Sequence, residues 1–210
     1  MATARTIDAP KALRALRRAD PVLGDLIKLV GPFDMTVKHS SSVFAVLSEA
    51  IVYQQLTGRA AETIHARVVA ACGADGDGLT AAHVLGASDE ALRGAGLSRA
   101  KVASLRDLAA HDQAGTLPSS TDVATMDDDD IVDHLTAVRG IGRWTAHMFL
   151  IFRLGRPDVL PVDDYGVRRA FGLVYRCETP TAKELAAHGE PWAPYRTVAS
   201  WYLWRALELP

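Results

Sequence analysis

Two aspartates stand side by side in the stretch "LPVDDYGVRRAF" (160–171), where an apolar pattern with helical spacing begins. Because Pro161 favours an extended backbone just before it, we expect a helix to start at Asp163 and Asp164. One carboxylate can cap the first turn, while the other lies at the positive end of the helix dipole and stays ionised. Such a carboxylate can stabilise a cation or position a water molecule, but it is a poor proton donor. The sequence leaves open which aspartate is the cap, and capping is also an adequate explanation for both.

A second stretch with chemical potential is "GIGRWTA" (140–146), which lies between two helical patterns. Gly140 can adopt the left-handed conformation that ends the first helix. Gly142 keeps side chains away, so that an outside group can approach the backbone at the start of the next helix. The free N–H groups there form a site for an anion such as a phosphate, and Arg139 and Arg143 flank it. A plain corner between two helices is the alternative.

Apolar residues recur with helical spacing along almost the whole chain, and strand-like alternation is hard to find. The best-defined apolar faces are those of Val43, Val46, Leu47, Ala50 and Ile51, of Ala61, Ile64, Val68 and Ala71, of Val102, Leu105 and Ala109, and of Ile131, Leu135 and Val138. These faces predict core packing, so the expected fold class is all-α. The stretch "TLPSSTD" (116–122) is a loop and a candidate domain boundary.

Two further patterns have both a structural and a functional interpretation. The run "DDDD" (127–130) suggests a metal cluster, but we favour the start of a helix, where carboxylates meet the positive end of the dipole. The stretch "LRGAGLSRA" (92–100) resembles "VRGIGRWTA" (138–146), because both lead from Arg-Gly-apolar-Gly into a helix. The similarity is either chance or the sign of two hairpins of similar build.

Composition limits the class of protein. A chain of 210 residues buries about 70% of its unfolded surface, so its core needs no disulfide or metal. The two cysteines, Cys72 and Cys177, are isolated, which fits a reducing compartment. No signal peptide is evident, and the longest apolar run, "MFLIF", is far too short to cross a bilayer. Because the net charge is −2, any binding to DNA must depend on a local patch, backbone amides or shape.

Five motifs, taken in order, resemble the helix–hairpin–helix DNA glycosylase superfamily. The hairpin matches the form apolar-x-Gly-apolar-Gly-x-x-Thr-Ala, and the aspartate pair follows it as in that family. The resemblance is close to the alkylbase branch, the 3-methyladenine DNA glycosylase II type, and covers about 40–210. Its other motifs are "IVYQQLTGRAA" (51–61), "GLSRAKVASLRDLA" (96–109) and "PWAPYRTVASWYLW" (191–204).

The resemblance implies a monofunctional DNA glycosylase that excises alkylated, cationic purines such as 3-methyladenine and 7-methylguanine in base excision repair. Such an enzyme flips the nucleotide out of the duplex and hydrolyses its N-glycosidic bond. The family pattern makes Asp164 the catalytic carboxylate, four residues before Arg168, with Asp163 as a cap or helper. A cationic base is already a good leaving group, so the carboxylate would stabilise the oxocarbenium-like sugar.

Trp144 distinguishes this chain from bifunctional relatives. Those carry a lysine two residues after the second hairpin glycine, and this lysine attacks the sugar. With tryptophan at that position no Schiff base can form, so no AP-lyase activity is expected. A tryptophan face can instead stack on a cationic base, which is worth about 0.5–2 kcal/mol. The expected substrate pocket consists of Trp144, Met148, Tyr165 and Trp204.

The resemblance also implies contacts to DNA and a cation site. Leu56 matches the wedge that fills the gap left by the flipped nucleotide, and Gln54 and Gln55 would contact the orphaned base. The remaining DNA contacts are expected from Arg139, Gly140, Gly142 and Arg143. The backbone carbonyls of Thr136, Val138 and Ile141 are expected to bind a monovalent cation (Na⁺ or K⁺). No catalytic cofactor is expected, nor an iron–sulfur cluster, since the cysteine quartet of some relatives is missing.

The expected architecture has two helical lobes, with the hairpin and the active-site cleft between them. Residues 1–40 would form a helical segment that packs with the C-terminal lobe, 41–120 the central lobe, and 121–210 the hairpin and the C-terminal lobe. The N-terminal β domain of the bacterial type protein is expected to be absent. We expect a monomer that binds double-stranded DNA with alkylated bases and no membrane. Its expected location is the bacterial cytoplasm, on the nucleoid when acting, or the nucleus of a eukaryote.

Three alternatives remain at this stage. A non-catalytic hairpin module that only binds DNA explains the glycines but neither the aspartate pair nor the tryptophans. The same enzyme class acting on a deaminated or oxidised base fits the motifs, although the aromatic pocket favours cations. A helical scaffold without a role on DNA explains none of the motifs.

Overall fold

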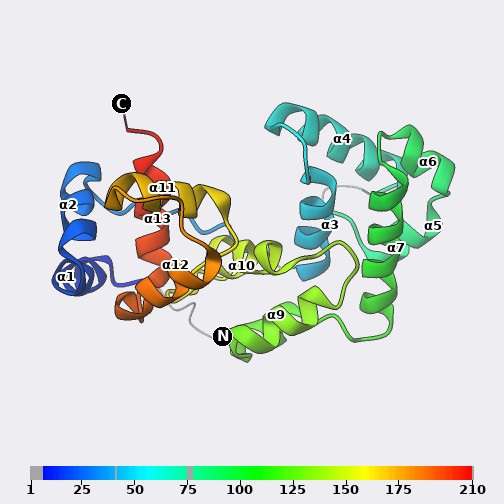
Figure 1. Cartoon of the computed structure of the whole chain (residues 1–210). Helices are drawn as coiled ribbons and strands as arrows, with labels where there is room; N and C mark the ends of the chain where they lie inside the picture. Colours follow the sequence, from blue (N-terminus) through cyan, green and yellow to red (C-terminus); the bar gives the residue numbers. More distant parts are fainter. Residues whose placement is uncertain (1–6, 41, 75–77, 210) are drawn as a thin grey trace. The chain divides into compact units, whose positions relative to one another are not determined.

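All regular structure in the described part of the chain is helical. The computed structural model describes residues 7–40, 42–74 and 78–209, and Figure 1 shows its helices coloured along the chain. They are α1 (Ala9–Ala19), α2 (Pro21–Val30), α3 (Val43–Tyr53), α4 (Gly58–Ala71), α5 (Ala81–Gly86), α6 (Asp89–Gly94), α7 (Arg99–Gln113), α8 (Ser120–Thr125), α9 (Asp128–Thr136), α10 (Arg143–Phe152), α11 (Tyr165–Tyr175), α12 (Ala182–His188), the short 3₁₀ helix η1 (Glu190–Trp192) and α13 (Arg196–Ala206). The all-α fold class is confirmed. None of the described helices combines the length and the apolar character that crossing a bilayer requires.

Contacts divide the chain into two compact units, and the boundaries between them do not lie in the loop at 116–122 that the sequence suggested. The central unit is Ser40–Ala146, and the terminal unit joins Met1–His39 to His147–Pro210. The sequence pointed to a lobe that combined the hairpin with the C-terminal segment. The hairpin instead belongs to the central unit, because its turn is bonded directly to α7. The N-terminal helices do share a unit with the C-terminal helices.

The terminal unit is built around α13, which packs against α11 and α2 (Figure 1). Tyr202 on α13 is fully buried, and its hydroxyl donates to the carbonyl oxygen of Gly31 at the end of α2 (2.8 Å). Asp20 caps α2 by accepting the N–H of Leu23 (3.0 Å), and it also accepts the indole N–H of Trp192 (3.0 Å). One buried carboxylate therefore joins the N-terminal helices to the C-terminal segment.

The central unit is built around α7, which packs against α3 and α5 (Figure 1). Leu105 and Leu108 on α7 are fully buried. Arg106 donates to the carbonyl oxygens of Val84 and Ala87 at the C-terminal end of α5 (2.5 Å each). A cationic side chain here satisfies carbonyl groups that have no partner within their own helix.

The aspartate run at 127–130 begins α9. Asp128, Asp129 and Asp130 occupy the first turn of this helix. Across the described ranges, no group of three or more His, Cys, Asp and Glu side chains is arranged to hold a metal ion. The run is therefore explained by its favourable interaction with the helix dipole.

Candidate functional site

The hairpin joins α9 to α10 through a tight turn with a buried centre. Gly140 has a φ of +80°, the left-handed conformation predicted for it. Val138 and Ile141 are buried, and the N–H of Ile141 donates to the carbonyl oxygen of Val138 (3.1 Å). The new helix, α10, then begins at Arg143. The short turn thus fixes the direction of the first free N–H groups of α10.

Gly142 has a different role from Gly140. Its φ lies outside the left-handed region, and a Cβ built on it would meet nothing within 4 Å. The fold therefore does not require glycine here, and the missing side chain leaves open space beside the N–H groups at the start of α10. Arg139 and Arg143 are exposed on either side, and among the described residues Arg143 makes only a long ion pair with the exposed Asp129 (4.0 Å). This arrangement suits the approach of an external anion.

The hairpin is anchored at three points within the central unit. A Cβ on Gly140 would lie 2.5 Å from Ser104 Oγ, so the turn packs tightly on α7. The backbone N–H of Arg139 donates to Asp107 Oδ2 on α7 (2.7 Å). The amide of Gln54 donates from Nε2 to the carbonyl oxygen of Gly140 (2.8 Å). Gln54, which we expected to contact an orphaned base, thus ties the segment after α3 to the hairpin.

The segment between α3 and α4 carries the expected wedge. Leu56 is half-buried, and the preceding Gln55 is exposed with a φ of +58°, an uncommon conformation for a residue with a side chain. Lys101 on α7 donates from Nζ to the carbonyl oxygens of Val52 (2.7 Å) and Gln54 (2.8 Å). Burial lowers the pKa of the Lys101 amine. Sequence reasoning did not assign this anchoring role, although Lys101 lies within the motif "GLSRAKVASLRDLA".

Asp164 is the N-cap of α11 in the terminal unit. Its Oδ1 accepts the backbone N–H of Val167 (2.7 Å) and the indole N–H of Trp204 (3.0 Å). Asp163 is exposed. The possibility that Asp163 is the cap and leaves Asp164 to the chemistry is therefore wrong, since the capping carboxylate and the candidate catalytic carboxylate are the same group. The backbone carbonyl of Asp164 accepts the N–H of Arg168 (3.1 Å), which is the first hydrogen bond of α11.

Trp204 comes to Asp164 from α13 and is positioned by two neighbours that sequence reasoning missed. The ring of Phe152 lies 5.6 Å from that of Trp204, tilted by 32°. A Cβ on Gly166 would lie 3.0 Å from Asp164 Oδ1 and 3.5 Å from Trp204 Cδ1. Glycine at this position therefore lets the indole and the carboxylate meet. The only signal in the sequence was the glycine itself, directly after "DDY".

The other pocket candidates lie on α10 and α11. Trp144 is 45% exposed in the first turn of α10, and Met148 follows one turn later, half-buried. Tyr165 is 65% exposed at the first position of α11. Large aromatic side chains that remain this exposed are candidates for contact with a ligand. Trp144 belongs to the central unit, whereas Met148, Tyr165 and Trp204 belong to the terminal unit.

Comparison with known proteins agrees with these features. The family model of the HhH-GPD superfamily base excision DNA repair proteins matches residues 49–194. "DNA-3-methyladenine glycosylase 1" of Schizosaccharomyces pombe is 33% identical over 88% of this chain and 81% of its own length. "Alkylbase DNA glycosidase-like protein mag2" of the same yeast is 28% identical over 96% of this chain and 95% of its own.

Solved structures of related proteins have the same fold. The 3-methyladenine DNA glycosylase Mag1 of the same yeast, in complex with abasic DNA, matches with a TM-score of 0.83 and 32% identity, over 95% of this chain and 97% of its own. A DNA-3-methyladenine glycosidase from Bacillus halodurans matches with a TM-score of 0.83 and 36% identity, over 96% and 90%. Since the family model spans most of the sequence, the chain belongs to the HhH-GPD superfamily of base excision DNA repair proteins.

Proposed function

We propose that this chain is a DNA glycosylase that excises alkylated purines of the 3-methyladenine type from double-stranded DNA in base excision repair. The observation that carries the proposal is the carboxylate of Asp164, held at the start of α11 by the N–H of Val167 and the indole of Trp204. The names of the yeast relatives and the abasic DNA in the Mag1 structure support the same activity.

The reaction is hydrolysis at C1′ of a flipped nucleotide. The C1′–N bond breaks, and its electron pair stays on the base nitrogen, which neutralises the positive charge of the alkylated base. Positive charge develops on the sugar, and the fixed carboxylate of Asp164 stabilises it. A water oxygen then bonds to C1′ and loses its proton to the carboxylate or to solvent. The products are a free base and an abasic site in an intact strand.

The cationic base is bound through aromatic faces. The central unit contributes the indole of Trp144, and the terminal unit contributes the indole of Trp204 together with Met148 and Tyr165. A cation over an indole face gains about 0.5–2 kcal/mol, which favours alkylated over neutral purines. Trp144 occupies the position of the nucleophilic lysine of bifunctional relatives, so the enzyme does not cleave the strand.

DNA contacts come from the central unit. The N–H groups beside Gly142 bind a phosphate of the damaged strand, with Arg139 and Arg143 adding charge. Leu56 enters the stack as the wedge. The exposed Gln55 then faces the orphaned base, because Gln54 is bonded to the hairpin.

We also propose a Na⁺ or K⁺ ion at the hairpin, held by the backbone carbonyls of Thr136, Val138 and Ile141. All three donors are oxygens, which suit a hard cation. Within the described ranges, the carbonyl of Val138 accepts one backbone hydrogen bond, from Ile141, and a carbonyl oxygen has two lone pairs. The ion would supply positive charge where a DNA phosphate approaches.

The test is base release from methylated duplex DNA by an Asp164→Asn variant. Asparagine is as good an N-cap as aspartate, so α11 should keep its start. We expect the rate of release to fall by about 100-fold or more, since a neutral amide cannot stabilise the sugar cation. DNA binding, measured by fluorescence anisotropy, should remain.

The matched control is Asp163→Asn, which removes an exposed carboxylate next to the site and should leave release close to the wild-type rate. Release that survives in Asp164→Asn would remove Asp164 from the chemistry. A wild-type protein that binds DNA but releases no base would identify a binding module instead.

A further inference from the structure

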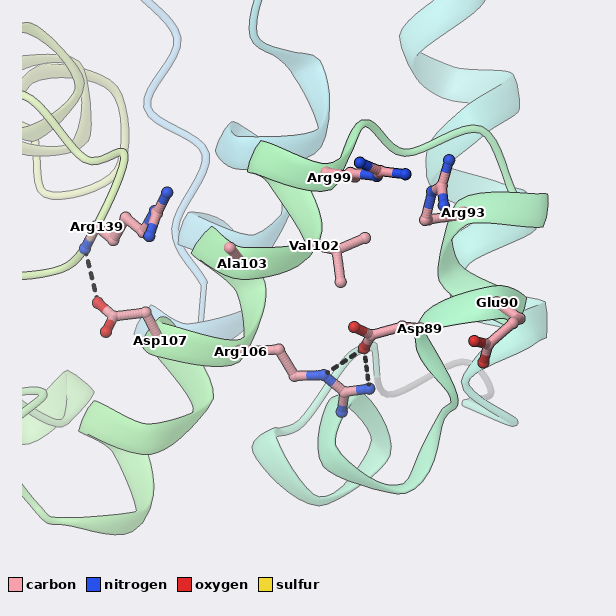
Figure 2. Close-up of a pocket in the computed structure, with 9 residues that line it drawn as sticks. All are labelled: Asp89, Glu90, Arg93, Arg99, Val102, Ala103, Arg106, Asp107 and Arg139. Atoms are coloured by element: carbon pink, nitrogen blue, oxygen red, sulfur yellow. Dashed lines mark hydrogen bonds and ion pairs between the residues drawn. The ribbon is translucent and has the colours of Figure 1, made fainter.

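The central unit contains an open pocket of about 710 Å³ between α6, α7 and the hairpin turn (Figure 2). Nine residues line it: Asp89, Glu90, Arg93, Arg99, Val102, Ala103, Arg106, Asp107 and Arg139. Four are arginines, in a chain whose net charge is −2. This concentration of guanidinium groups is what a binding site for an anion requires.

Two of the acidic groups in the pocket are already engaged. Asp89 Oδ1 accepts hydrogen bonds from Arg106 Nη2 (2.8 Å) and Nε (3.2 Å), as Figure 2 shows. Asp107 Oδ2 accepts the backbone N–H of Arg139 (2.7 Å) and lies 3.7 Å from His111 Nε2. The structural pair of Arg106 and Asp89 therefore contributes no free charge to the pocket.

The other three arginines have no such partner. The side chains of Arg93, Arg99 and Arg139 are exposed, and none makes an ion pair or a side-chain hydrogen bond within the described ranges. They come from three different elements: the end of α6, the start of α7 and the hairpin turn. Glu90 is the one carboxylate of the lining left to oppose them. Planar guanidinium groups bind phosphate oxygens with two parallel hydrogen bonds, so three of them around one opening match a phosphate group.

The turn between α6 and α7 is built like the hairpin itself. Gly96 has a φ of +111°, the next residue, Leu97, is buried, and α7 begins at Arg99. In the hairpin, Gly140 has a φ of +80°, the next residue is buried, and α10 begins at Arg143. The repeated sequence pattern thus reflects two similar turns. The structural match pairs Gly96 with Gly140, two residues out of the register that the sequence similarity suggested.

The two turns differ where a helix start would receive an anion. Ser98 occupies the position of Gly142, and its hydroxyl already accepts the N–H of Lys101 (3.2 Å). The second turn therefore offers arginine side chains in place of an open helix start. Arg139 lies in the hairpin and in the pocket lining at once, so the pocket is continuous with the proposed DNA-binding turn.

We propose that Arg93 and Arg99, together with Arg139, which the two sites share, form a second phosphate-binding site, which holds the DNA backbone beside the site at the start of α10. The inference rests on the proposed function in that its ligand is duplex DNA. The site is open, exposed and contiguous with the hairpin, which suits a phosphodiester of a long polyanion better than an enclosed small molecule.

The experiment measures binding of undamaged duplex DNA at several salt concentrations by the double variant Arg93→Gln/Arg99→Gln. Each lost phosphate contact reduces the slope of log K against log salt by about 0.9. We expect the slope to become shallower by about one to two, and the affinity at low salt to fall about tenfold or more. The control, Arg67→Gln, removes an exposed arginine of α4 that lies outside the pocket, and its slope should match the wild type.

The other outcomes separate the possible explanations. A slope and an affinity equal to those of Arg67→Gln would overturn the proposal. If, in addition, inorganic phosphate or a mononucleotide stabilises the wild type and not the double variant against heat, the pocket takes a free phosphate compound. A wild type that shows the salt effect but releases no methylated base refutes the proposed activity and leaves this site standing. If the double variant is too unstable to measure, each single variant should still reduce the slope of log K against log salt by about 0.9.

Discussion

The carboxylate of Asp164 accepts two hydrogen bonds on one oxygen, from the backbone N–H of Val167 and from the indole N–H of Trp204. The first bond belongs to the fold, since it caps α11. The second comes from α13 and fixes the orientation of the carboxylate. A group held in this way needs no reorganisation when positive charge develops beside it, and such preorganisation is a large part of catalysis. Gly166 is part of the arrangement because a methyl group there would crowd both partners.

We predict that Trp204→Phe slows base release about tenfold or more, while α11 keeps its cap through Val167. Phenylalanine retains an aromatic face but cannot donate to Asp164 Oδ1, so the carboxylate loses its second anchor. Single-turnover release of methylated base at saturating enzyme measures the effect on the chemical step.

A matched control exists elsewhere in the terminal unit. The indole N–H of Trp192 also donates to an aspartate, Asp20, over the same 3.0 Å. Trp192→Phe should therefore lower the melting temperature and leave the rate of release nearly unchanged. Equal loss of rate in both variants would show that the indole bond of Trp204 serves only stability.

At the scale of the element, the two glycines of the hairpin should respond differently to alanine. Gly140→Ala forces a side chain into the left-handed region and within 2.5 Å of Ser104 Oγ. We expect it to lower the free energy of unfolding by about 1–3 kcal/mol. Gly142→Ala meets nothing within 4 Å and should leave stability unchanged, but its methyl group would stand where a phosphate approaches.

Chemical denaturation and DNA binding, measured on both variants, separate these roles. The prediction is weakened DNA binding by Gly142→Ala at wild-type stability, and lost stability in Gly140→Ala. Wild-type DNA affinity in Gly142→Ala would remove the open helix start from the binding site.

The features that could be predicted from the sequence depend on residues that are close to one another along the chain. The helical faces, the turn at Gly140 and the aspartate start of α9 follow from residues within a turn or two. The bonds of Gln54 to Gly140 and of Lys101 to Val52 span 86 and 49 residues, so they exist only once the helices have packed. The unit boundary could not be predicted either, because α10 crosses it with unbroken helical periodicity.

At the scale of the whole molecule, charge is distributed unevenly. The net charge of −2 includes the acidic first turn of α9, where the carboxylates serve a helix dipole. Arg93, Arg99 and Arg139 gather at one pocket instead. A weakly acidic chain can therefore bind a polyanion, since attraction within a Debye length depends on the local patch and not on the sum.

The terminal unit is assembled from both ends of the chain, and Asp20 connects them. Its carboxylate accepts hydrogen bonds from the hydroxyl of Tyr175 (2.5 Å), the indole of Trp192 (3.0 Å) and Nε2 of His188 (3.2 Å). Burial alone would raise the pKa of Asp20, but these bonds and the N–H of Leu23 together lower it below its ordinary value. The ionised form is therefore the form that holds the unit together.

A depressed pKa makes this connection sensitive to acid in a defined direction. Because the folded-state pKa of Asp20 lies below the unfolded value of about 3.9, its contribution to stability is present above about pH 4 and is lost as the pH falls through the lower, folded-state pKa. Asp20→Asn keeps a residue that can cap α2, but it should be less stable than the wild type at pH 7 and lose less stability on acidification. Chemical denaturation between pH 7 and about pH 2.5 measures both. Asp25→Asn, which removes an exposed carboxylate paired with Lys28, should show the wild-type pH dependence. If Asp20→Asn also follows the wild-type curve, the acid sensitivity of the unit arises from other carboxylates.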